Sequence, residues 1–410
     1  MASPPARPRK LPPVWLLGMA NAPLGVAGGL ALLTLPQLLA ARHVPETSIA
    51  GITSLGLLAS TCAFLLGPLL DVWLSRRAYA ALSTLVCAAS AATALLNVGN
   101  LGVLTVAVAS MMLFAQVNTN AIGGWFGSLE DKEADAGLGA WMVVANTAGF
   151  GLIAMAAIPV VRGASPGLAA AALVAPLLLP LAIYVVTPAH RPGRRQARES
   201  FGRFFADIGG LARRPTLLRL LLLFTAPAAS FALTNTLGGL GRDYHASEVF
   251  VGVIGGAAAT LAGILGSLSV AVLARRAPGT LLYLAVGAGG AAFTLSLILL
   301  PRTPALFALA MIGQNIAQSA ALALVSVLAL QSLGEDNPLA ATQFGLLVCA
   351  SNLPITYMQW IDGHAYGLGG LPLMYGADGG LGLVACGLLA VLLTLWRGRL
   401  TGREAAVSRA

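Results

Sequence analysis

The segment that decides the fold is GPLLDVWLSRRA, residues 67–78, which begins as an apolar run and ends in charge. Its charged residues are Asp71, Arg76 and Arg77. The second half of the chain contains a related segment, GSLSVAVLARRA, residues 266–277. Both segments share a Gly-x-Leu start and a Leu-x-Arg-Arg-Ala end. A frame that returns in this way predicts two homologous halves.

Composition places the chain in a lipid bilayer. Of its 410 residues, 57% are apolar and only 10% are charged, whereas soluble domains carry about 25% charged residues. Apolar stretches of about 20 residues, the length that crosses a bilayer as a helix, recur from end to end. Open sheet edges are not tolerated in lipid, and the alternation typical of barrel strands is missing. The sequence therefore predicts an all-α polytopic membrane protein.

Apolar runs separated by polar breaks predict twelve transmembrane helices in two six-helix bundles. Their limits are 14–40, 48–70, 78–97, 101–128, 137–161, 166–187, 216–240, 248–274, 279–300, 304–332, 338–361 and 373–396. A long arginine-rich connection separates the sixth helix from the seventh. The predicted domains are an N-terminal bundle at 1–187, a cytoplasmic basic linker at 188–215 and a C-terminal bundle at 216–410.

The distribution of basic residues predicts the orientation. With a cytoplasmic N-terminus, twenty of the 24 lysines and arginines fall on the cytoplasmic side, as the positive-inside rule requires. Both termini are then cytoplasmic, and we expect a bacterial inner membrane. The net charge of +9 follows from this bias and faces an anionic lipid leaflet. We therefore expect the lipid bilayer, and no nucleic acid, as the partner of these charges.

Around the first copy of the repeated frame, the sequence resembles the major facilitator superfamily. The signature of that family between helices 2 and 3 runs Gly-x-Leu-x-Asp and then a basic cluster. Gly67, Leu69, Asp71, Arg76 and Arg77 match it, although the second glycine of the signature is missing. The resemblance implies two bundles that rock about a central site, which is transport by alternating access.

The resemblance also implies a latch that closes one conformation and opens in the other. The aspartate would sit near a helix N-terminus in the facing half, where the helix dipole favours an anion. The arginines would pair with acids that follow helix 4, and the second copy of the frame would add its own arginines. The alternative is that the arginines only anchor the topology. The expected gating residues are Asp71, Arg76, Arg77, Glu130, Asp131, Arg275 and Arg276.

Five stretches resemble one branch of that superfamily, the peptide/acetyl-CoA/drug transporters, which includes AmpG-type muropeptide permeases. The branch also includes inner-membrane permeases for siderophores. The resemblance implies a peptidoglycan fragment or a siderophore as substrate, moved inward. The stretches are NAPLGVAGGLALLTLPQLLA (21–40), GPLLD (67–71), RRPTLLRLLLLF (213–224), GRDYHASEVFVGVIGG (241–256) and DNPLAATQFGLLVCASNLP (336–354).

The acidic residues depart from that branch. Its permeases often carry carboxylates in helices 4 and 7, where this chain has QVNTNAIGGWF (116–126) and TAPAASFALTN (225–235). All fifteen acids lie at predicted helix ends or in connections, so the default intramembrane site for proton coupling is missing. Coupling to a proton or another ion stays open, through peripheral acids. These are Asp71, Asp243, Asp362 and Asp378.

The predicted helices contain amide side chains in place of acids. They concentrate in helices 1, 4, 7 and 10, which this superfamily is expected to wrap around its cavity. A buried amide needs a partner, so each one either joins helices or lines a polar, uncharged substrate path. The candidate substrate-binding residues are Asn21, Asn118, Asn120, Asn146, Asn235, Gln314, Asn315, Gln318 and Asn352.

The sequence predicts a secondary active or facilitative transporter for a polar, mid-sized solute. An exporter of drugs or metabolites is the alternative, and a non-transporting assembly or receptor protein is a further one. The four cysteines and four histidines form no metal-ligand pattern. No nucleophile or acid–base pair is visible either. We therefore expect no enzyme activity, no catalytic residue, no metal and no cofactor, and we expect a monomer.

Overall fold

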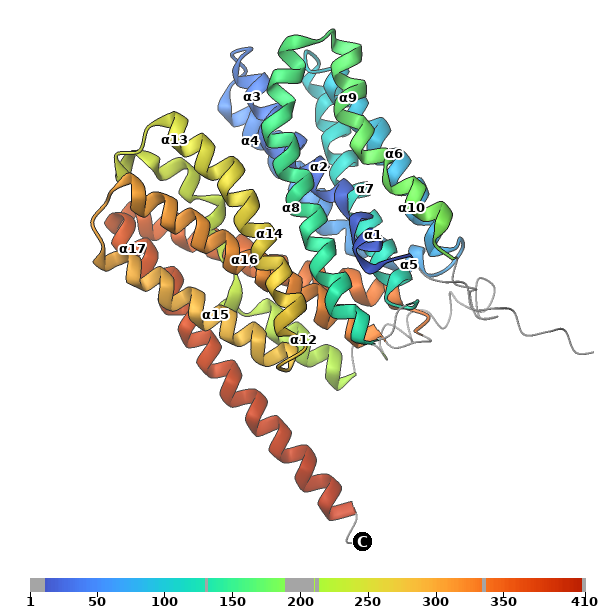
Figure 1. Ribbon diagram of the computed structural model, residues 1–410, viewed down its shortest axis with the longest axis vertical. Helices are drawn as coiled ribbons and strands as arrows, with labels where there is room; N and C mark the ends of the chain where they lie inside the picture. The colour runs from blue at the N-terminus through green and yellow to red at the C-terminus, as the bar shows by residue number, and fades with distance from the viewer. Residues whose placement is uncertain (1–11, 130–131, 189–209, 211–213, 334–336, 408–410) are drawn as a thin grey trace, which may run out of the picture. The chain divides into compact units, whose positions relative to one another are not determined.

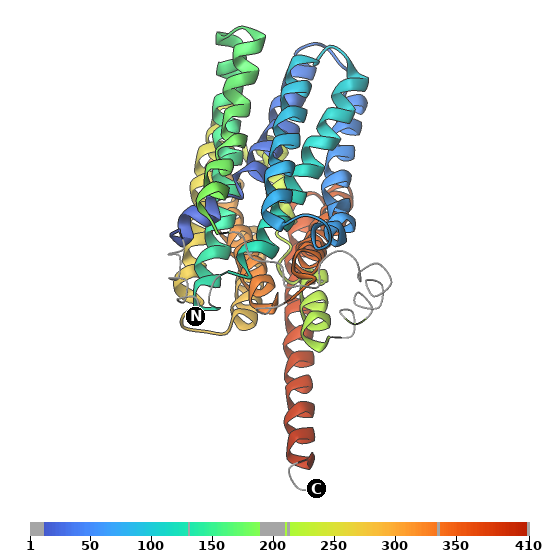
Figure 2. The same ribbon diagram turned by 90° about the vertical axis from the view of Figure 1, so that its right-hand side faces the viewer.

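A computed structural model describes residues 12–129, 132–188, 210, 214–333 and 337–407, and every regular element among them is a helix (Figures 1 and 2). Contacts divide the chain into two units. Unit 1 comprises Met1–Leu211 together with Ala329–Leu346, and unit 2 comprises Ala212–Leu328 together with Leu347–Ala410. The predicted linker lies almost wholly outside the described residues. The predicted domain boundaries stay a prediction.

Unit 1 follows the predicted spans closely. Its helices are α1 (Val14–Met19), α2 (Ala22–Gly29), α3 (Leu35–Ala40), α4 (Glu46–Cys62), α5 (Gly67–Leu70), α6 (Arg76–Leu96), α7 (Leu101–Phe126), α8 (Lys132–Gly163), α9 (Pro166–Leu178) and α10 (Pro180–Val186). A π-helical turn at Leu30–Thr34 joins α2 to α3. These three helices with their turn make one span, and α9 with α10 makes another.

Glycines set the closest helix contact of unit 1. A Cβ atom at Gly25 would lie 1.8 Å from the carbonyl oxygen of Asn146, and one at Gly29 would lie 2.8 Å from the Cβ of Ile153. Both positions lie on α2 against α8, so the two backbones approach as only small residues allow. Beside this contact, buried side chains such as Leu30 and Met111 form an apolar core.

Unit 2 contains longer and more irregular segments. Its regular helices are α12 (Pro215–Thr225), α13 (Glu248–Val253), α14 (Ala259–Leu273), α15 (Gly279–Ser296), α16 (Pro304–Leu333) and α17 (Ala340–Val407). The last turn of α16 and the first two turns of α17 belong to unit 1. Helix α17 is two helices, because Gly369 and Gly370 have non-helical dihedral angles and Gly370 has a φ of 65°. The predicted helix limit at 361 was therefore too early.

The predicted continuous helix over 216–240 was wrong. Helix α12 ends at Thr225, and three short 3₁₀ turns follow at Pro227–Ala229, Ala232–Asn235 and Leu237–Tyr244. Proline disfavours a helical conformation in the residue before it, and Ala226 is extended with φ −80° and ψ 151°. Phe231 then adopts the left-handed region with a φ of 47°.

Side chains from other helices satisfy the carbonyl groups that this break sets free. The hydroxyl of Tyr357 donates to the Thr225 carbonyl at 2.8 Å, and the thiol of Cys386 donates to the Ala228 carbonyl at 3.2 Å. Gln318 Nε2 donates to the Phe231 carbonyl at 3.3 Å. Non-helical backbone at membrane depth is tolerated only with such partners. We name the stretch 226–235 with these donors the broken segment.

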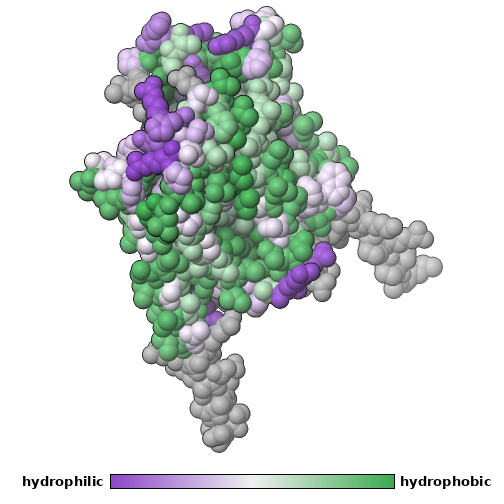
Figure 3. All heavy atoms as spheres, turned by 60° about the vertical axis from the view of Figure 1, so that its left-hand side comes forward, coloured by the Kyte–Doolittle hydropathy of each residue, from purple (hydrophilic) through white to green (hydrophobic). Residues whose placement is uncertain are grey.

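Helix length and composition confirm an all-helical polytopic membrane protein. Among the described residues, ten helices are long and apolar enough to cross a membrane, and α12 is a shorter apolar helix. One of the ten, Ala340–Leu395, contains the break at Gly369–Gly370 and therefore covers two predicted spans. Figure 3 shows hydrophobic side chains over most of the visible face, with hydrophilic ones in a few groups.

Candidate functional site

The first copy of the repeated frame builds a buried ion pair in unit 1. Asp71 follows α5 directly, and Arg76 is the first residue of α6. The Arg76 guanidinium binds Oδ1 of Asp71 through Nε at 2.9 Å and through Nη2 at 2.8 Å. The exposed fraction of the side chain is 11% for Arg76 and 1% for Asp71. The pair is therefore almost out of contact with solvent.

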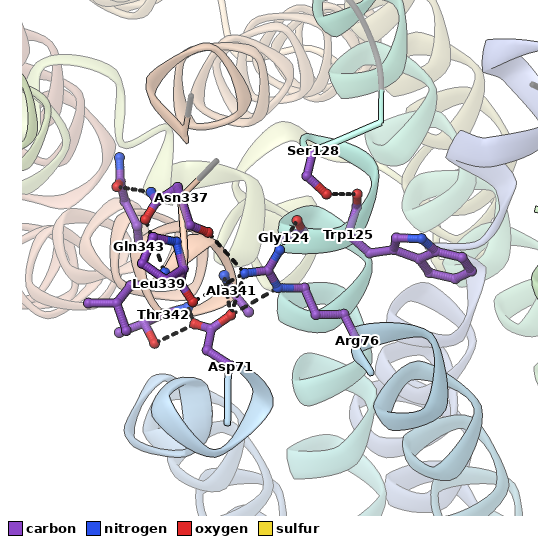
Figure 4. A network of polar contacts seen from close by, with 11 residues as sticks. Asp71, Arg76, Gly124, Trp125, Ser128, Asn337, Leu339, Ala341, Thr342 and Gln343 are labelled. Atoms are coloured by element: carbon purple, nitrogen blue, oxygen red, sulfur yellow. Dashed lines mark hydrogen bonds and ion pairs between the residues drawn. The ribbon is translucent and has the colours of Figure 1, made fainter. Parts of the chain in front are cut away.

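The start of α17 supplies the other donors to Asp71 (Figure 4). The backbone N–H of Ala341 donates to Oδ1 at 3.2 Å. The backbone N–H and the hydroxyl of Thr342 donate to Oδ2 at 2.9 and 2.8 Å. The first amides of a helix have no partner within the helix and attract negative charge. Asp71 thus lies at the N-terminal end of α17, whose first two turns belong to unit 1, and the gating role that the resemblance implies stays a prediction.

Arg76 uses its remaining donors on backbone carbonyls. Nη1 donates to Gly124 in the last turn of α7 at 3.2 Å, and Nη2 donates to Asn337 at 3.1 Å and to Pro338 at 3.3 Å. A cation is favoured at the C-terminal end of a helix. Because one partner in each bond is charged, these hydrogen bonds are stronger than neutral ones. We name Asp71, Arg76 and the α17 start that they bind the Asp71 network.

Burial raises the pKa of the Asp71 carboxyl above its ordinary value. The charge of Arg76 and the donors of Thr342 act in the opposite direction and favour the ionised form. Every group within hydrogen-bond distance of Asp71 described above is a donor, so the ionised carboxylate is the form that this network satisfies.

Two glycines allow the α17 start to approach this network. A Cβ atom at Gly67 would lie 2.9 Å from the Cα of Thr342, and one at Gly124 would lie 2.6 Å from the Cα of Ala341. Asn337 fixes the same turn, because its Oδ1 accepts from the Leu339 N–H at 3.0 Å. The signature glycine is therefore a packing residue of the network.

The other predicted gating residues do not join the Asp71 network. Arg77 donates to the carbonyls of Val185 and Thr187, at 3.4 and 3.5 Å, at the end of α10. Arg275 and Arg276 lie exposed after α14. The expected partners Glu130 and Asp131 lie outside the described residues, and Arg76 instead pairs with the aspartate five positions before it.

Two predicted amides of unit 1 join helices. Asn118 is fully buried, and its Oδ1 accepts from the hydroxyls of Tyr184 at 2.8 Å and Thr84 at 3.3 Å. Its Nδ2 donates to the Ala20 carbonyl at 3.3 Å. Asn21 donates to the Met142 carbonyl at 2.9 Å and accepts from the Thr119 hydroxyl at 2.7 Å. Both amides have their donors and acceptors occupied by the protein.

Asn120 differs from these two amides. Its side chain is 1% exposed, and its Oδ1 accepts from Gln116 Nε2 at 3.2 Å. Among the described residues, Nδ2 of Asn120 has no hydrogen-bond partner. It lies beside Gly345, where an added Cβ atom would be 2.8 Å away. A buried donor without an acceptor is costly, so Asn120 is the amide of unit 1 best suited to take a ligand acceptor.

The predicted amides of unit 2 make fewer contacts between helices. Gln314 is fully buried and donates to the Thr294 hydroxyl at 2.6 Å, while its Oε1 has no partner among the described residues. Asn315 donates to the Met311 carbonyl of its own helix at 2.8 Å. Asn235 is exposed and donates to Gln359 Oε1 at 3.5 Å. Gln318 belongs to the broken segment described above.

The remaining two predicted amides, Asn146 and Asn352, are half-buried. The backbone carbonyl of Asn146 forms the close contact with Gly25. In unit 1, Asn21 binds Thr119 and Met142, and Asn118 binds Thr84, Tyr184 and Ala20. Of the nine predicted amides, four lie in unit 1 and five in unit 2.

Two acids of α17 are buried where the sequence predicted peripheral positions. Asp362 is fully buried and Asp378 is 6% exposed, although both were expected at the periphery. The predicted spans end at 361 and resume at 373, so residues 362–372 were expected in a connection. In the structure only Gly369 and Gly370 leave the helix, so Asp362 lies well inside a helical segment.

No protein-family model and no curated protein sequence matches the chain. Several solved structures do. The human organic anion transporter MFSD10 (TETRAN) is 18% identical with a TM-score of 0.72, over 94% of this chain and 100% of the other. The proton:xylose symporter XylE is 13% identical with a TM-score of 0.69, over 94% of each chain. The E. coli fucose:proton symporter FucP is 14% identical with a TM-score of 0.64, over 92% of this chain and 98% of the other.

These matches define the fold of the chain. The structures of XylE and FucP are described as major facilitator superfamily transporters. The chain therefore has the major facilitator superfamily fold, as the repeated frame had indicated. At identities this low the similarity reaches the fold and does not distinguish a branch within the superfamily.

Proposed function

We propose that this protein is a secondary transporter that moves a small solute across a membrane by alternating access. The fold supports this proposal, and the Asp71 network carries it. A buried carboxylate at the start of α17, held by donors from two elements far apart in sequence, suits a contact that forms in one conformation and is replaced by water in another. Arginines that only anchor the membrane topology need no buried network and can stay exposed, as Arg275 does.

The substrate we propose is a polar, mid-sized solute of the muropeptide or siderophore kind, as the five resembling stretches suggest. Asn21 and Asn118 are occupied in joining helices, so substrate contacts fall to other amides. Asn120 offers a buried free donor, and Asn235 offers an exposed amide at the end of the broken segment. Such groups recognise the hydroxyl and amide acceptors of a sugar–peptide or a hydroxamate without requiring an opposite charge.

The membrane and orientation are part of the same proposal. Twenty of 24 basic residues fall on one side of the predicted topology, which supports cytoplasmic termini in a bacterial inner membrane. We propose a monomer as the working unit, because each superfamily bundle pair encloses its own path.

A ligand screen followed by transport tests this function. The purified full chain is heated with anhydro-muropeptides, with iron-loaded siderophores and with hydrophobic drugs, because a ligand that binds only the folded state raises the melting temperature. The stabilising compound is then offered to liposomes that contain the protein. We expect saturable uptake of a muropeptide or siderophore. Stabilisation by drugs alone, with efflux, would support the exporter alternative.

Variants separate a substrate role from a structural one. Asn120→Ala should lower uptake at least tenfold, the equivalent of about 1.4 kcal/mol. Because the variant also leaves Gln116 Nε2 without its acceptor, uptake is expressed per amount of folded protein in the liposomes. The matched control is Asn97→Ala, which removes an amide that donates to the Thr93 carbonyl at the end of α6. Equal loss of uptake in both variants would contradict a specific role for Asn120.

A further inference from the structure

The C-terminal end of α10 is fastened by two side chains from other helices of unit 1. Arg77 donates through Nη2 to the Val185 carbonyl at 3.4 Å and through Nη1 to the Thr187 carbonyl at 3.5 Å. Trp125 donates through Nε1 to the Pro188 carbonyl at 3.1 Å. The last carbonyl groups of a helix, and those that follow it, have no partner within the helix. We name these three contacts the α10 clasp.

The chain just before the clasp is also held in place. The Tyr184 hydroxyl donates to Oδ1 of Asn118 at 2.8 Å, and the Tyr184 ring lies 5.9 Å from the Trp125 ring between centroids. The hydroxyl of Thr187 donates to the Ile183 carbonyl at 2.7 Å. The end of α10 is therefore fixed as far as Pro188, directly before the part of the predicted basic linker that lies outside the described residues.

Arg77 does more in the clasp than a topology anchor requires. A cation is favoured at the C-terminal end of a helix, where the carbonyl groups point outward. Arg77 is the second arginine of the repeated frame, and Arg276 holds the same place in the second copy. Arg276 is exposed, so the frame itself does not require its second arginine to bind a helix end. The carbonyl contacts of Arg77 therefore indicate a function particular to the first copy.

The last turn of α7 lies between the α10 clasp and the Asp71 network. Gly124 accepts from Nη1 of Arg76 at 3.2 Å, and a Cβ atom at Gly124 would lie 2.6 Å from the Cα of Ala341. The next residue, Trp125, is 1% exposed, and its indole ring points away from Asp71 (Figure 4). Two consecutive residues of one turn therefore contact the network on one side and form the clasp on the other.

Hydrogen bonds make this turn one unit. The Gly127 N–H donates to the Gly123 carbonyl at 3.1 Å, and the Ser128 hydroxyl donates to the Trp125 carbonyl at 2.6 Å. Opening the Asp71 network would remove from the turn both the donor of Arg76 and the α17 backbone that packs on it. Segments that lose their packing open locally as cooperative units. Because Trp125 belongs to the turn, its bond to the end of α10 would be lost in the same event.

We propose that the last turn of α7 couples the Asp71 network to the α10 clasp, so that opening the network releases the end of α10 where the predicted basic linker begins. Arg77 and Trp125 are then positioning residues, which fix the start of the linker and contact no substrate. The inference rests on the proposed function, in which the Asp71 network opens during transport. It goes beyond that function by naming where the opening is transmitted. Such coupling is reciprocal, so loss of the clasp also weakens the network.

The first experiment tests the clasp and needs no substrate. Deuterium exchange of backbone amides is measured by mass spectrometry on the full chain in lipid nanodiscs. Trp125→Phe and Arg77→Ala should each raise exchange in peptides that cover 183–188 by at least about threefold, because local opening governs exchange. Arg276→Ala, the matched change in the second copy, should leave that exchange unchanged. Phe126→Leu, which reduces apolar volume in the same turn and keeps the indole donor, should raise it less than Trp125→Phe. Unchanged exchange in both clasp variants would overturn the proposal.

The second experiment tests the coupling by the same measurement. The partners of Asp71 are Arg76 and the α17 start, yet Asp71→Asn should raise exchange at 183–188 as well as at Ala341 and Thr342. In return, Trp125→Phe should raise exchange at Ala341 and Thr342, which a role confined to packing α10 would not do. Thr342→Val is the second variant if Asp71→Asn does not fold. Faster exchange that stays confined to the α17 start in the network variants would overturn the coupling.

Uptake by liposomes separates this proposal from the proposed function. If a solute is taken up but the network variants leave exchange at 183–188 at the wild-type rate, the protein is a transporter and the coupling is wrong. If the variants show coupled exchange but no solute moves, the coupling stands and the proposed function fails. We expect Trp125→Phe to lower uptake several-fold per amount of folded protein in the liposomes.

Discussion

The two copies of the repeated frame share the close packing of their glycine and differ at the position of the acid. Both keep a glycine against another backbone, since a Cβ atom would lie 2.9 Å from the Cα of Thr342 at Gly67 and 2.2 Å from the Ile316 carbonyl oxygen at Gly266. The acid position is Asp71 in the first copy and the buried Val270 in the second. The arginines of the two copies therefore have different surroundings.

In the first copy the acid turns Arg76 inward, whereas Arg275 and Arg276 of the second copy stay exposed. The comparison teaches that the glycine and the basic pair are the common scaffold of the frame. The polar network is an addition that exists where an acid and a helix N-terminus meet. Variants in both copies can test this division of roles.

The largest effect is expected from Asp71→Ala. The change leaves the buried Arg76 without its anion, and breaking a buried ion pair in this way costs about 3–5 kcal/mol. We expect a large drop in the unfolding midpoint in detergent and loss of transport. The double variant Asp71→Ala with Arg76→Ala should be more stable than Asp71→Ala alone. Two single losses that simply add would show that the residues do not form a network.

Thr342→Val should have a smaller effect of the same kind. It removes the hydroxyl that donates to Asp71 at 2.8 Å and keeps the shape of the side chain and the backbone donor. A hydrogen bond to a charged group contributes about 1.5–3 kcal/mol. The unfolding midpoint of this variant measures the loss. A midpoint unchanged from the wild type would mean that the backbone amides hold the carboxylate unaided.

Replacing the first glycine of either copy of the frame with alanine should lower the free energy of unfolding by a similar amount. Gly67→Ala and Gly266→Ala each push a methyl group into a neighbouring backbone, and overpacking costs about 1–3 kcal/mol. Gly252→Ala in α13 is the control, because nothing lies within 4 Å of its added Cβ atom. Thermal unfolding of the three variants gives the comparison. A destabilised Gly67 variant beside an unaffected Gly266 variant would refute a shared scaffold.

The smallest effect on stability is expected from Arg275→Ala. The side chain is exposed, and substitutions of that kind usually change stability by less than about 0.5 kcal/mol. Its melting temperature should match the wild type, while Arg76→Ala should be clearly destabilised. A destabilised Arg275 variant would show that the second copy also holds a network. That result would remove the contrast between the copies.

The fold could be predicted from the sequence because its signals are long and local. Apolar runs such as Leu101–Phe126 need no tertiary information, and a bilayer permits only helices for them. Prediction failed where one residue decides the backbone. Pro227 ends α12, and the turn at Gly369–Gly370 comes after the predicted helix limit at 361.

The candidate site was predictable in part. The motif singled out Asp71 and Arg76, but the partners of these residues depend on how α5, α6 and the start of α17 meet, which no local pattern records. Most of the predicted amides lie buried or half-buried. Which of them are satisfied, such as Asn118, and which keep a free donor, such as Asn120, depends on a neighbour one or two helices away.

The broken segment has a consequence for how this protein can change over generations. The break after α12 at Pro227 leaves carbonyl groups outside the α-helical pattern. Tyr357 donates to that of Thr225 and Cys386 to that of Ala228, while Gln318 adds a donor to that of Phe231, which also accepts from Thr234. A lineage that lost the proline and restored a continuous helix would no longer need these three side chains. Among natural relatives, the four positions should therefore be inherited as a set, and chains that keep the proline should keep a donor at each of the other three.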